Sequence, residues 1–192
     1  MGAYSPVPQI GDDVVQQAIE TIVKPTVEAM AAEGTPFTGI LYAGLIATQD
    51  GPKVIEFNAR FGDPETEVVL PKLTSDLGAG ITAILNGETP EFTWDEDNAT
   101  LGVVLASDGY PGEIVKGAHI PQIATDADSH VYYAGVARGD DGLVANSGRV
   151  LLVEASAPDL TAAQRKVYGI LDAVNTEGMF YRHDIGAKAL KA

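Results

Sequence analysis

A regular alternation of apolar and polar residues marks the segment Lys53-Val-Ile-Glu-Phe-Asn-Ala59. Successive side chains of a β-strand point to opposite faces, so the alternation predicts a strand here. Ile55, Phe57 and Ala59 lie on one side of that strand. They are expected to form its buried face and so to fix its register.

The residues before this strand predict its partner. Residues 39–48 are almost entirely apolar, which indicates a strand buried on both faces. Asp50-Gly51 follows them and is typical of a tight reversal. The two segments are therefore expected to pair as an antiparallel hairpin.

Apolar residues recur at helical spacing before the hairpin. Asp12 or Asp13 is expected to cap this helix, Pro25 to interrupt it and Gly34 to end it. The apolar positions that define the helical face are Val15, Ile19, Ile22 and Val23.

Two more helices are predicted after the hairpin, over residues 64–70 and 75–85. The segment 86–98 that follows is polar, and a domain boundary is expected within it. The predicted domains span residues 1–92 and 93–192.

Beyond the predicted boundary, short apolar segments alternate with turn residues. Thr161 and Gln164 have the spacing of a capping box at the head of a helix that runs to about Val174. The expected strands cover residues 99–106, 131–138 and 150–155. This pattern predicts a small α+β unit with an antiparallel sheet. Residues 1–8, with two prolines, are expected to form a loop.

Charge and composition narrow the class of function. The 192 residues include 12 Lys and Arg against 27 Asp and Glu, a net charge of −15, so nucleic acids and anionic membranes are not expected as partners. The small number of Lys and Arg residues also makes it unlikely that the chain forms a nucleotide site by itself, because triphosphates are usually held by several cationic groups. The chain has no cysteine, and it shows no signal peptide or apolar run long enough to span a bilayer. A cytoplasmic location is the expectation.

Candidate chemistry lies on the polar side of the strand over residues 53–59. Side chains two apart share a face roughly 6.6 Å from one another, so Glu56, Asn58 and Arg60 are expected to project together. A carboxylate and an amide oxygen suit Mg²⁺, and a guanidinium suits a bidentate grip on phosphate or carboxylate. The simpler interpretation of the same pattern is a solvated strand face.

The next residues, Asp63-Pro-Glu65, resemble an ordinary helix start. Asp63 is expected as the N-cap, Pro64 at the first helical position and Glu65 in the first turn. Acids at a helix N-terminus repel phosphate, so Asp63 and Glu65 are also expected to face a cationic ligand such as an amine. The three histidines lack the spacing of metal ligands.

The stretch Arg60-Phe-Gly-Asp-Pro-Glu-Thr-Glu67 resembles the signature of the glycinamide ribonucleotide synthetases, the phosphoribosylamine-glycine ligases of the ATP-grasp class. Met1-Gly-Ala-Tyr-Ser-Pro6 and Phe37-Thr-Gly-Ile-Leu-Tyr-Ala-Gly44 resemble further segments of that family. So does Arg182-His-Asp-Ile-Gly186. The resemblance covers essentially the whole chain, and it implies an α+β fold: the C-terminal half of an ATP-grasp domain followed by a small α+β domain.

The resemblance also implies an activity, in which ATP drives the joining of glycine to 5-phosphoribosylamine through an acyl phosphate. By motif, Glu56 and Asn58 would bind Mg²⁺ or Mn²⁺. Arg60, Asp63 and Glu65 would be catalytic. These three would also contact substrate together with the other substrate-binding candidates, which are Tyr4, Ser5 and Pro64. Arg149 and Arg182 are secondary candidates.

Family members continue upstream of the matched segments, so the resemblance implies only the C-terminal half. The partner would be the N-terminal half, and the chain alone is expected to bind ATP poorly and to be inactive. Two other interpretations stay open. One is a non-catalytic module in which the polar residues serve no reaction, and the other is a different ATP-grasp carboxylate-amine ligase.

Overall fold

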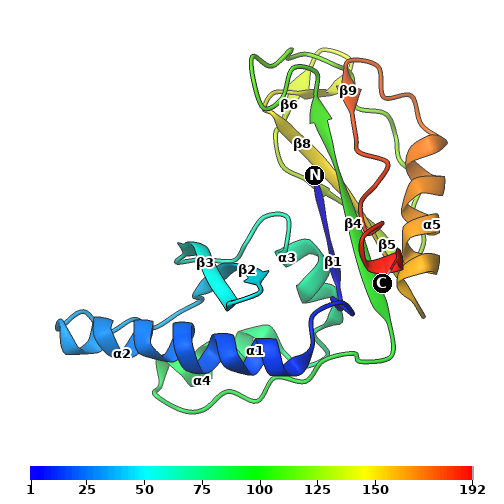
Figure 1. Cartoon of the computed structure of the whole chain (residues 1–192). Helices are drawn as coiled ribbons and strands as arrows, with labels where there is room; N and C mark the ends of the chain where they lie inside the picture. The colour runs from blue at the N-terminus through cyan, green and yellow to red at the C-terminus, as the bar shows by residue number, and fades with distance from the viewer. Residues whose placement is uncertain (192) are drawn as a thin grey trace. The chain divides into compact units, whose positions relative to one another are not determined.

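A computed structural model describes residues 1–191 (Figure 1). The chain divides into two compact units, and each is discontinuous in sequence. The larger unit comprises Met1–Pro6, Asp63–Leu73 and the residues from Trp94 onward, and the smaller comprises Val7–Gly62 and Thr74–Thr93. The predicted domain boundary between residues 92 and 93 refers to domains of the longer family protein. These compact units do not test it, so it stays a prediction.

An antiparallel sheet forms the centre of the larger unit. Its strands follow the order β1, β4, β8, β5, and β9 also pairs with β4. The bounds are β1 Gly2–Ser5, β4 Ala99–Ser107, β5 Ser129–Tyr133, β8 Arg149–Ala157 and β9 Met179–Phe180. A separate hairpin joins β6 Val136–Gly139 to β7 Gly142–Ala145.

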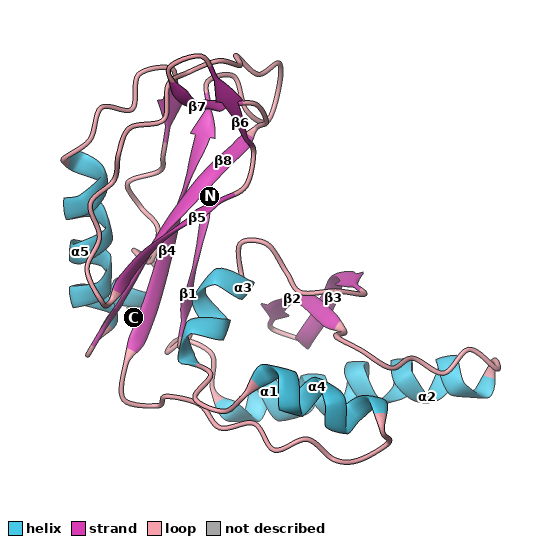
Figure 2. Cartoon of the chain, turned by 180° about the vertical axis from the view of Figure 1, so that it is seen from behind, coloured by secondary structure: helices cyan, strands magenta, loops and turns pink. Residues whose placement is uncertain are grey.

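Helices cover both faces of this sheet, α5 (Leu160–Asp172) on one side and α3 (Thr66–Val69) on the other (Figure 2). All nine residues of β4 are therefore buried. Leu101, Val103 and Leu105 join the core with the apolar face of α5, while Gly102 on the opposite side lies close to Val68 of α3. The near-continuous apolar sequence of β4 reflects this double covering.

The smaller unit joins a helical segment to the predicted hairpin. The hairpin is confirmed: β2 (Tyr42–Thr48) pairs antiparallel with β3 (Gly51–Asn58), and Gly51 has a φ of +88° at the reversal. The other elements are α1 Asp12–Ala18, the π-helical turn η1 Ile19–Val23, α2 Lys24–Ala32 and α4 Leu77–Leu85. The short 3₁₀ turns η2 Leu70–Lys72 and η3 Ala189–Lys191 belong to the larger unit.

The first helix starts and bends differently from the prediction. Gly11, rather than Asp12 or Asp13, occupies the N-cap position. The helix does not break at Pro25 but widens into η1 just before it. A proline has no N–H to continue the α-helical pattern, and a π-helical turn is a common way to accommodate such a gap.

The predicted burial of the hairpin is wrong. Ile55 and Phe57 are 67% and 39% exposed, and Ala59 is exposed as well. The segment 39–48 is half-buried or exposed rather than covered on both faces. Within residues 1–191 the hairpin is a two-stranded sheet, and a strand pair buries its faces only where another layer packs on them.

Three further predictions fail, the first two because of contacts between segments far apart in the sequence. The expected N-terminal loop contains β1, which pairs with β4 in the register Gly2 to Val103. The expected strand 131–138 splits into β5 and β6 at Gly135, where a Cβ atom would lie 2.4 Å from the carbonyl oxygen of Arg149. The cap of α5 is Asp159, whose side chain accepts from the Ala162 N–H at 2.7 Å, and not Thr161.

Candidate active site

Glu56 and Asn58 lie side by side near the end of β3, as the alternation predicts. The amide Nδ2 of Asn58 donates a hydrogen bond to Oε1 of Glu56 at 3.1 Å. This bond leaves Asn58 Oδ1 and Glu56 Oε2 unused by the pair, and both are oxygen atoms of the kind that Mg²⁺ prefers. The Glu56 side chain is exposed and that of Asn58 half-buried, so solvent and ligands can reach them. The donor set fits a hard divalent cation shared with phosphate oxygens.

Arg60 lies two residues beyond the end of β3, in a bend. Strand alternation therefore no longer fixes the direction of its side chain, contrary to the expectation that it continues the face of Glu56 and Asn58. Its guanidinium Nη1 donates to the carbonyl oxygen of the neighbouring Phe61 at 2.8 Å, and the residue is exposed. Reorientation of this side chain towards an anion would cost only that one local bond.

Asp63 is not the helix cap that the sequence indicates. Helix α3 begins at Thr66, with Glu65 at the N-cap position, after a turn that contains a cis peptide bond between Asp63 and Pro64. Arg149, at the start of β8, holds this turn instead. Its Nη1 lies 3.1 Å from Oδ1 of Asp63 and donates to the Asp63 carbonyl oxygen at 2.7 Å.

Glu65 contributes its main chain to the start of α3. Its carbonyl oxygen accepts hydrogen bonds from the Val68 and Val69 N–H groups, both at 3.1 Å. Its side chain is half-buried, and Pro64 beside it is buried. The predicted role of Asp63 and Glu65 towards a substrate amine stays a prediction.

The sequence prediction overlooked Glu67 in the same segment. Its Oε2 atom is buried without a hydrogen-bond partner among the described residues. Burial raises the pKa of Glu67, and the nearby charges of Asp63 and Glu65 raise it further, while Arg149 lowers it. An unpaired carboxylate oxygen next to two other acids favours a proton or a cationic ligand. Its place in the quoted motif was the only sequence signal for it.

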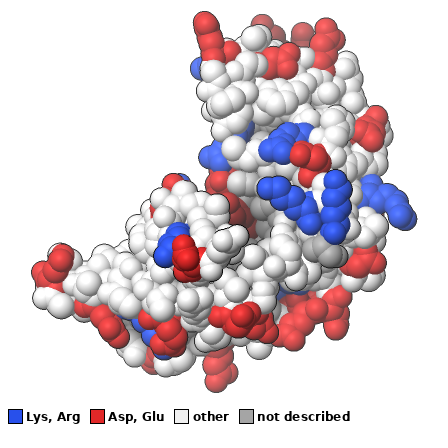
Figure 3. Space-filling model, viewed as in Figure 1, with Lys and Arg blue, Asp and Glu red and all other residues white. Residues whose placement is uncertain are grey.

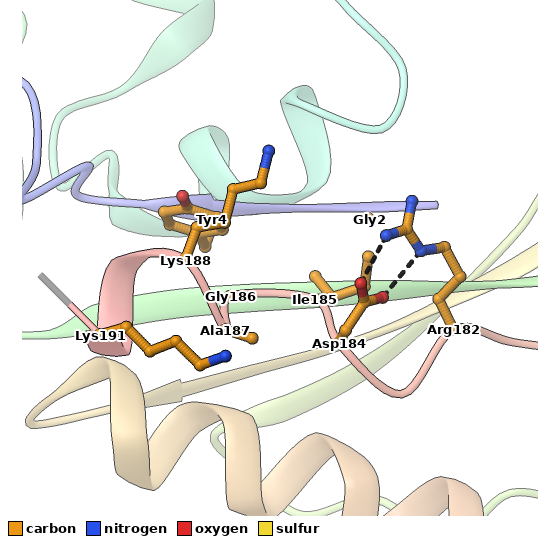
Figure 4. A pocket seen from close by; sticks show the side chains of 9 residues that line it. All are labelled: Gly2, Tyr4, Arg182, Asp184, Ile185, Gly186, Ala187, Lys188 and Lys191. Atoms are coloured by element: carbon orange, nitrogen blue, oxygen red, sulfur yellow. Dashed lines mark hydrogen bonds and ion pairs between the residues drawn. The ribbon is translucent and has the colours of Figure 1, made fainter.

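Tyr4 and Ser5 belong to β1, the edge strand. Tyr4 packs against the core of the larger unit and lines a cavity together with Arg182 and Lys188 (Figure 4). Ser5 lies opposite Thr100 of β4 at the end of the strand. The structure thus pairs Glu56 with Asn58 and Asp63 with Arg149, and Tyr4 and Arg182 line the same cavity.

Two family models match the chain. Residues 1–66 match the ATP-grasp (A) domain of phosphoribosylglycinamide synthetase, and residues 100–188 match its C domain. Among curated relatives, the phosphoribosylamine-glycine ligase of Streptococcus pyogenes is 51% identical over 193 aligned residues and that of Halalkalibacterium halodurans 55% identical over 191. These alignments cover 100% and 99% of the chain but only 46% and 44% of the relatives.

A solved structure agrees with the sequence comparisons. The phosphoribosylamine-glycine ligase of Thermotoga maritima is 33% identical and superposes with a TM-score of 0.82, over 96% of this chain and 46% of that one. The fold and the matched segments define an ATP-grasp protein with α+β architecture. The chain belongs to the phosphoribosylglycinamide synthetase family, and it spans less than half the length of these relatives.

The described helices include none that is both long and apolar enough to cross a bilayer.

Proposed function

We propose that the chain is the C-terminal half of an ATP-dependent ligase that joins glycine to 5-phosphoribosylamine and so forms glycinamide ribonucleotide for purine biosynthesis. The observation that carries this proposal is the hydrogen-bonded pair of Glu56 and Asn58 in a chain of this family. ATP would transfer its γ-phosphoryl group to the glycine carboxylate with release of ADP, and the sugar amine would attack the acyl carbon of the resulting glycyl phosphate and displace inorganic phosphate. We place this reaction in the cytoplasm, in keeping with the sequence prediction.

In the proposed site, Glu56 and Asn58 would hold Mg²⁺ or Mn²⁺ through their oxygen atoms. A divalent cation there would neutralise charge on the ATP phosphates. Arg60 is exposed, and its guanidinium would bind the transferring phosphoryl group or the glycine carboxylate. Positioning and charge neutralisation supply most of the catalysis of phosphoryl transfer, and these three groups would contribute to both.

Asp63 and Glu65 would face the amine of glycine or of the sugar. Arg149 engages Oδ1 of Asp63, which keeps the turn in place while Oδ2 stays outside that contact. Glu67, with its unpaired oxygen and raised pKa, would receive a proton from the attacking amine. Tyr4, Ser5 and Pro64 would contribute contacts around the substrate.

The proposed partner is the N-terminal portion of the family protein. The exposed apolar side chains of β3, among them Ile55 and Phe57, support this partner because neighbouring apolar side chains exposed on one element commonly mark an interaction surface. A net charge of −15 also supports it, since a triphosphate needs cations that would come from elsewhere.

The test mixes the chain with a separately produced N-terminal portion of a family member and measures glycine-dependent phosphate release. Glu56→Gln keeps the size of the side chain but weakens a metal ligand, and it is expected to lower the rate by about 100-fold or more. Glu88→Gln, on an exposed residue of the same unit, is the matched control and should leave the rate unchanged. Full activity of Glu56→Gln would refute the metal role, and inactivity of the unmodified mixture would favour a non-catalytic module.

A further inference from the structure

A second cavity, of about 750 Å³, lies within the larger unit at the edge of the sheet that β5 forms. Its walls come from β5, the end of β8, the start of α5 and the segment that precedes β4. No residue of the segment 56–67 lines it, and none of the cavity beside β1 does. Its volume lies in the range of small-molecule sites.

His130 and Tyr132 form an aromatic wall of this cavity. Their side chains lie on the same face of β5 because they are two residues apart in the strand. The ring centroids are 6.1 Å apart, and the two ring planes differ by 29°. Two nearly parallel rings form a stack that a further planar ring can extend.

A buried carboxylate holds the imidazole of His130 from behind. Nδ1 of His130 lies 2.9 Å from Oε2 of Glu154, a residue of β8 that is fully buried. Oε1 of Glu154 accepts a hydrogen bond from the Ser156 hydroxyl at 3.0 Å. Because Nδ1 is engaged, Nε2 is the ring nitrogen left for a ligand. The orientation of the ring is set before binding, which lowers the entropic cost of binding.

Three polar atoms of the lining residues have no hydrogen-bond partner within residues 1–191. They are Nε2 of His130, the hydroxyl of Tyr132 and Oδ1 of Asn98. Nδ2 of Asn98 donates to Oδ2 of Asp95 at 2.7 Å, so the amide is held and its oxygen is the atom left over. A ring nitrogen, a hydroxyl and an amide oxygen offer both donors and acceptors. The polar edge of a nucleobase presents the same mixture.

The charges around the cavity disfavour an anionic ligand. Asp95 and Asp128 line it, and a hydrogen bond from Asn98 lowers the pKa of Asp95, which therefore stays ionised at neutral pH. Lys166 lies 2.9 Å from Asp126 and 3.7 Å from Asp128, so its charge is already matched. The chain carries a net charge of −15, and Figure 3 shows Asp and Glu atoms on both units. A phosphate group would meet repulsion here.

We propose that this cavity binds an uncharged nucleobase, free or as its nucleoside. The ring would extend the stack of His130 and Tyr132, and its polar edge would bond to the unused atoms of these residues and of Asn98. Stacking on aromatic side chains tolerates every base, so the geometry assigns the class of ligand rather than one base. The site is independent of the proposed ligase reaction, because none of the residues given a role in that reaction lines it.

The test titrates the 192-residue chain with adenosine, ribose and AMP and follows amide chemical shifts. Adenosine is expected to shift signals of β5 and of the start of α5, and ribose is expected to shift none of them. AMP should bind there about fivefold more weakly or worse, because its phosphate meets the carboxylates. Adenosine shifts confined to other elements would overturn the site. AMP binding at β5 as tightly as adenosine would overturn the uncharged ligand.

Two adjacent tyrosines provide a matched pair of variants. Tyr132→Leu removes a ring from the cavity wall and should weaken adenosine binding by about fivefold or more. Tyr133→Leu is the control, since Tyr133 is 51% exposed and its side chain lies on the opposite face of β5. It should change the affinity by less than about twofold. Equal weakening by the two variants, or no weakening by Tyr132→Leu, would overturn the proposed stack.

A measurement on the unmodified chain covers the case in which Tyr132→Leu does not fold. Nuclear Overhauser effects are expected between the adenine protons of bound adenosine and the ring protons of His130 and Tyr132. Their absence at saturating adenosine would overturn the stack. Tyr132→Phe keeps the ring but loses the hydroxyl, and it should weaken binding by about threefold. Unchanged affinity in Tyr132→Phe would overturn the role of that hydroxyl.

Discussion

Strands β3 and β4 have apolar-rich sequences, yet they are buried to very different extents. All nine residues of β4 are buried, since α3 and α5 cover its two faces. In β3, Ile55 is 67% exposed and Phe57 39% exposed. Apolar pattern therefore tells which side chains share a face, whereas burial depends on a second layer that only one of the two units supplies.

The largest expected effect contrasts a buried residue of β4 with an exposed residue of β3. Leu105→Ala is expected to lower the free energy of unfolding of the larger unit by about 3 kcal/mol, because it leaves a cavity in a fully buried site. Ile55→Ala should cost less than about 0.5 kcal/mol in the smaller unit, since the side chain is already in water. Native-state hydrogen exchange of the two strands measures both. Similar costs at the two positions would contradict the contrast.

Two glycines with nearly the same positive φ allow a second comparison, between a closely packed position and an open one. Gly186 and Gly34 have φ values of +80° and +79°, but a Cβ atom at Gly186 would meet Leu101 at 2.7 Å while none lies within 4 Å of the equivalent atom at Gly34. Gly34→Ala is expected to cost about 1 kcal/mol from backbone strain alone. Gly186→Ala should cost about 2 to 3 kcal/mol, because overpacking adds to the strain. Thermal unfolding of the two variants measures both losses of stability. Equal losses would show that packing adds nothing at Gly186.

The smallest expected effect concerns a buried acid. Glu154 of β8 is fully buried, where it accepts from Ser156 and pairs with His130 at 2.9 Å. Burial raises its pKa above 4.5, and these hydrogen bonds lower it only in part. The folded protein then holds a proton that the unfolded chain has lost, so stability falls as pH rises from about 4.5 through the raised pKa.

Glu154→Gln should remove that pH dependence and stabilise the protein by about 1 kcal/mol at pH 8, because an amide is cheaper to bury than a carboxylate. Glu56→Gln on exposed β3 is the control and should change stability by less than about 0.5 kcal/mol. Urea unfolding at pH 5 and pH 8 measures both. A destabilised Glu154→Gln at pH 8 would show that the pairing with His130 outweighs the cost of burial.

Local features were predictable because their causes lie within a few residues. The hairpin follows from alternation around Asp50-Gly51, and the pairing of Glu56 with Asn58 follows from strand geometry. Edge strand β1 was not predictable, since its partner lies about a hundred residues away in β4. The role of Asp63 was mispredicted as a helix cap for the same reason. Its ion-pair partner Arg149 lies far away in the sequence, and no residue near Asp63 indicates that pairing.

The sequence by itself determined the family, the alternation that aligns Glu56 with Asn58 and the acidic balance of the chain. Tertiary structure decided which apolar faces are covered, which arginine holds Asp63, and that Tyr4, Arg182 and Lys188 line one cavity. The physical reason is that backbone geometry repeats over two to four residues, whereas burial and charge pairing depend on which distant segments fold together.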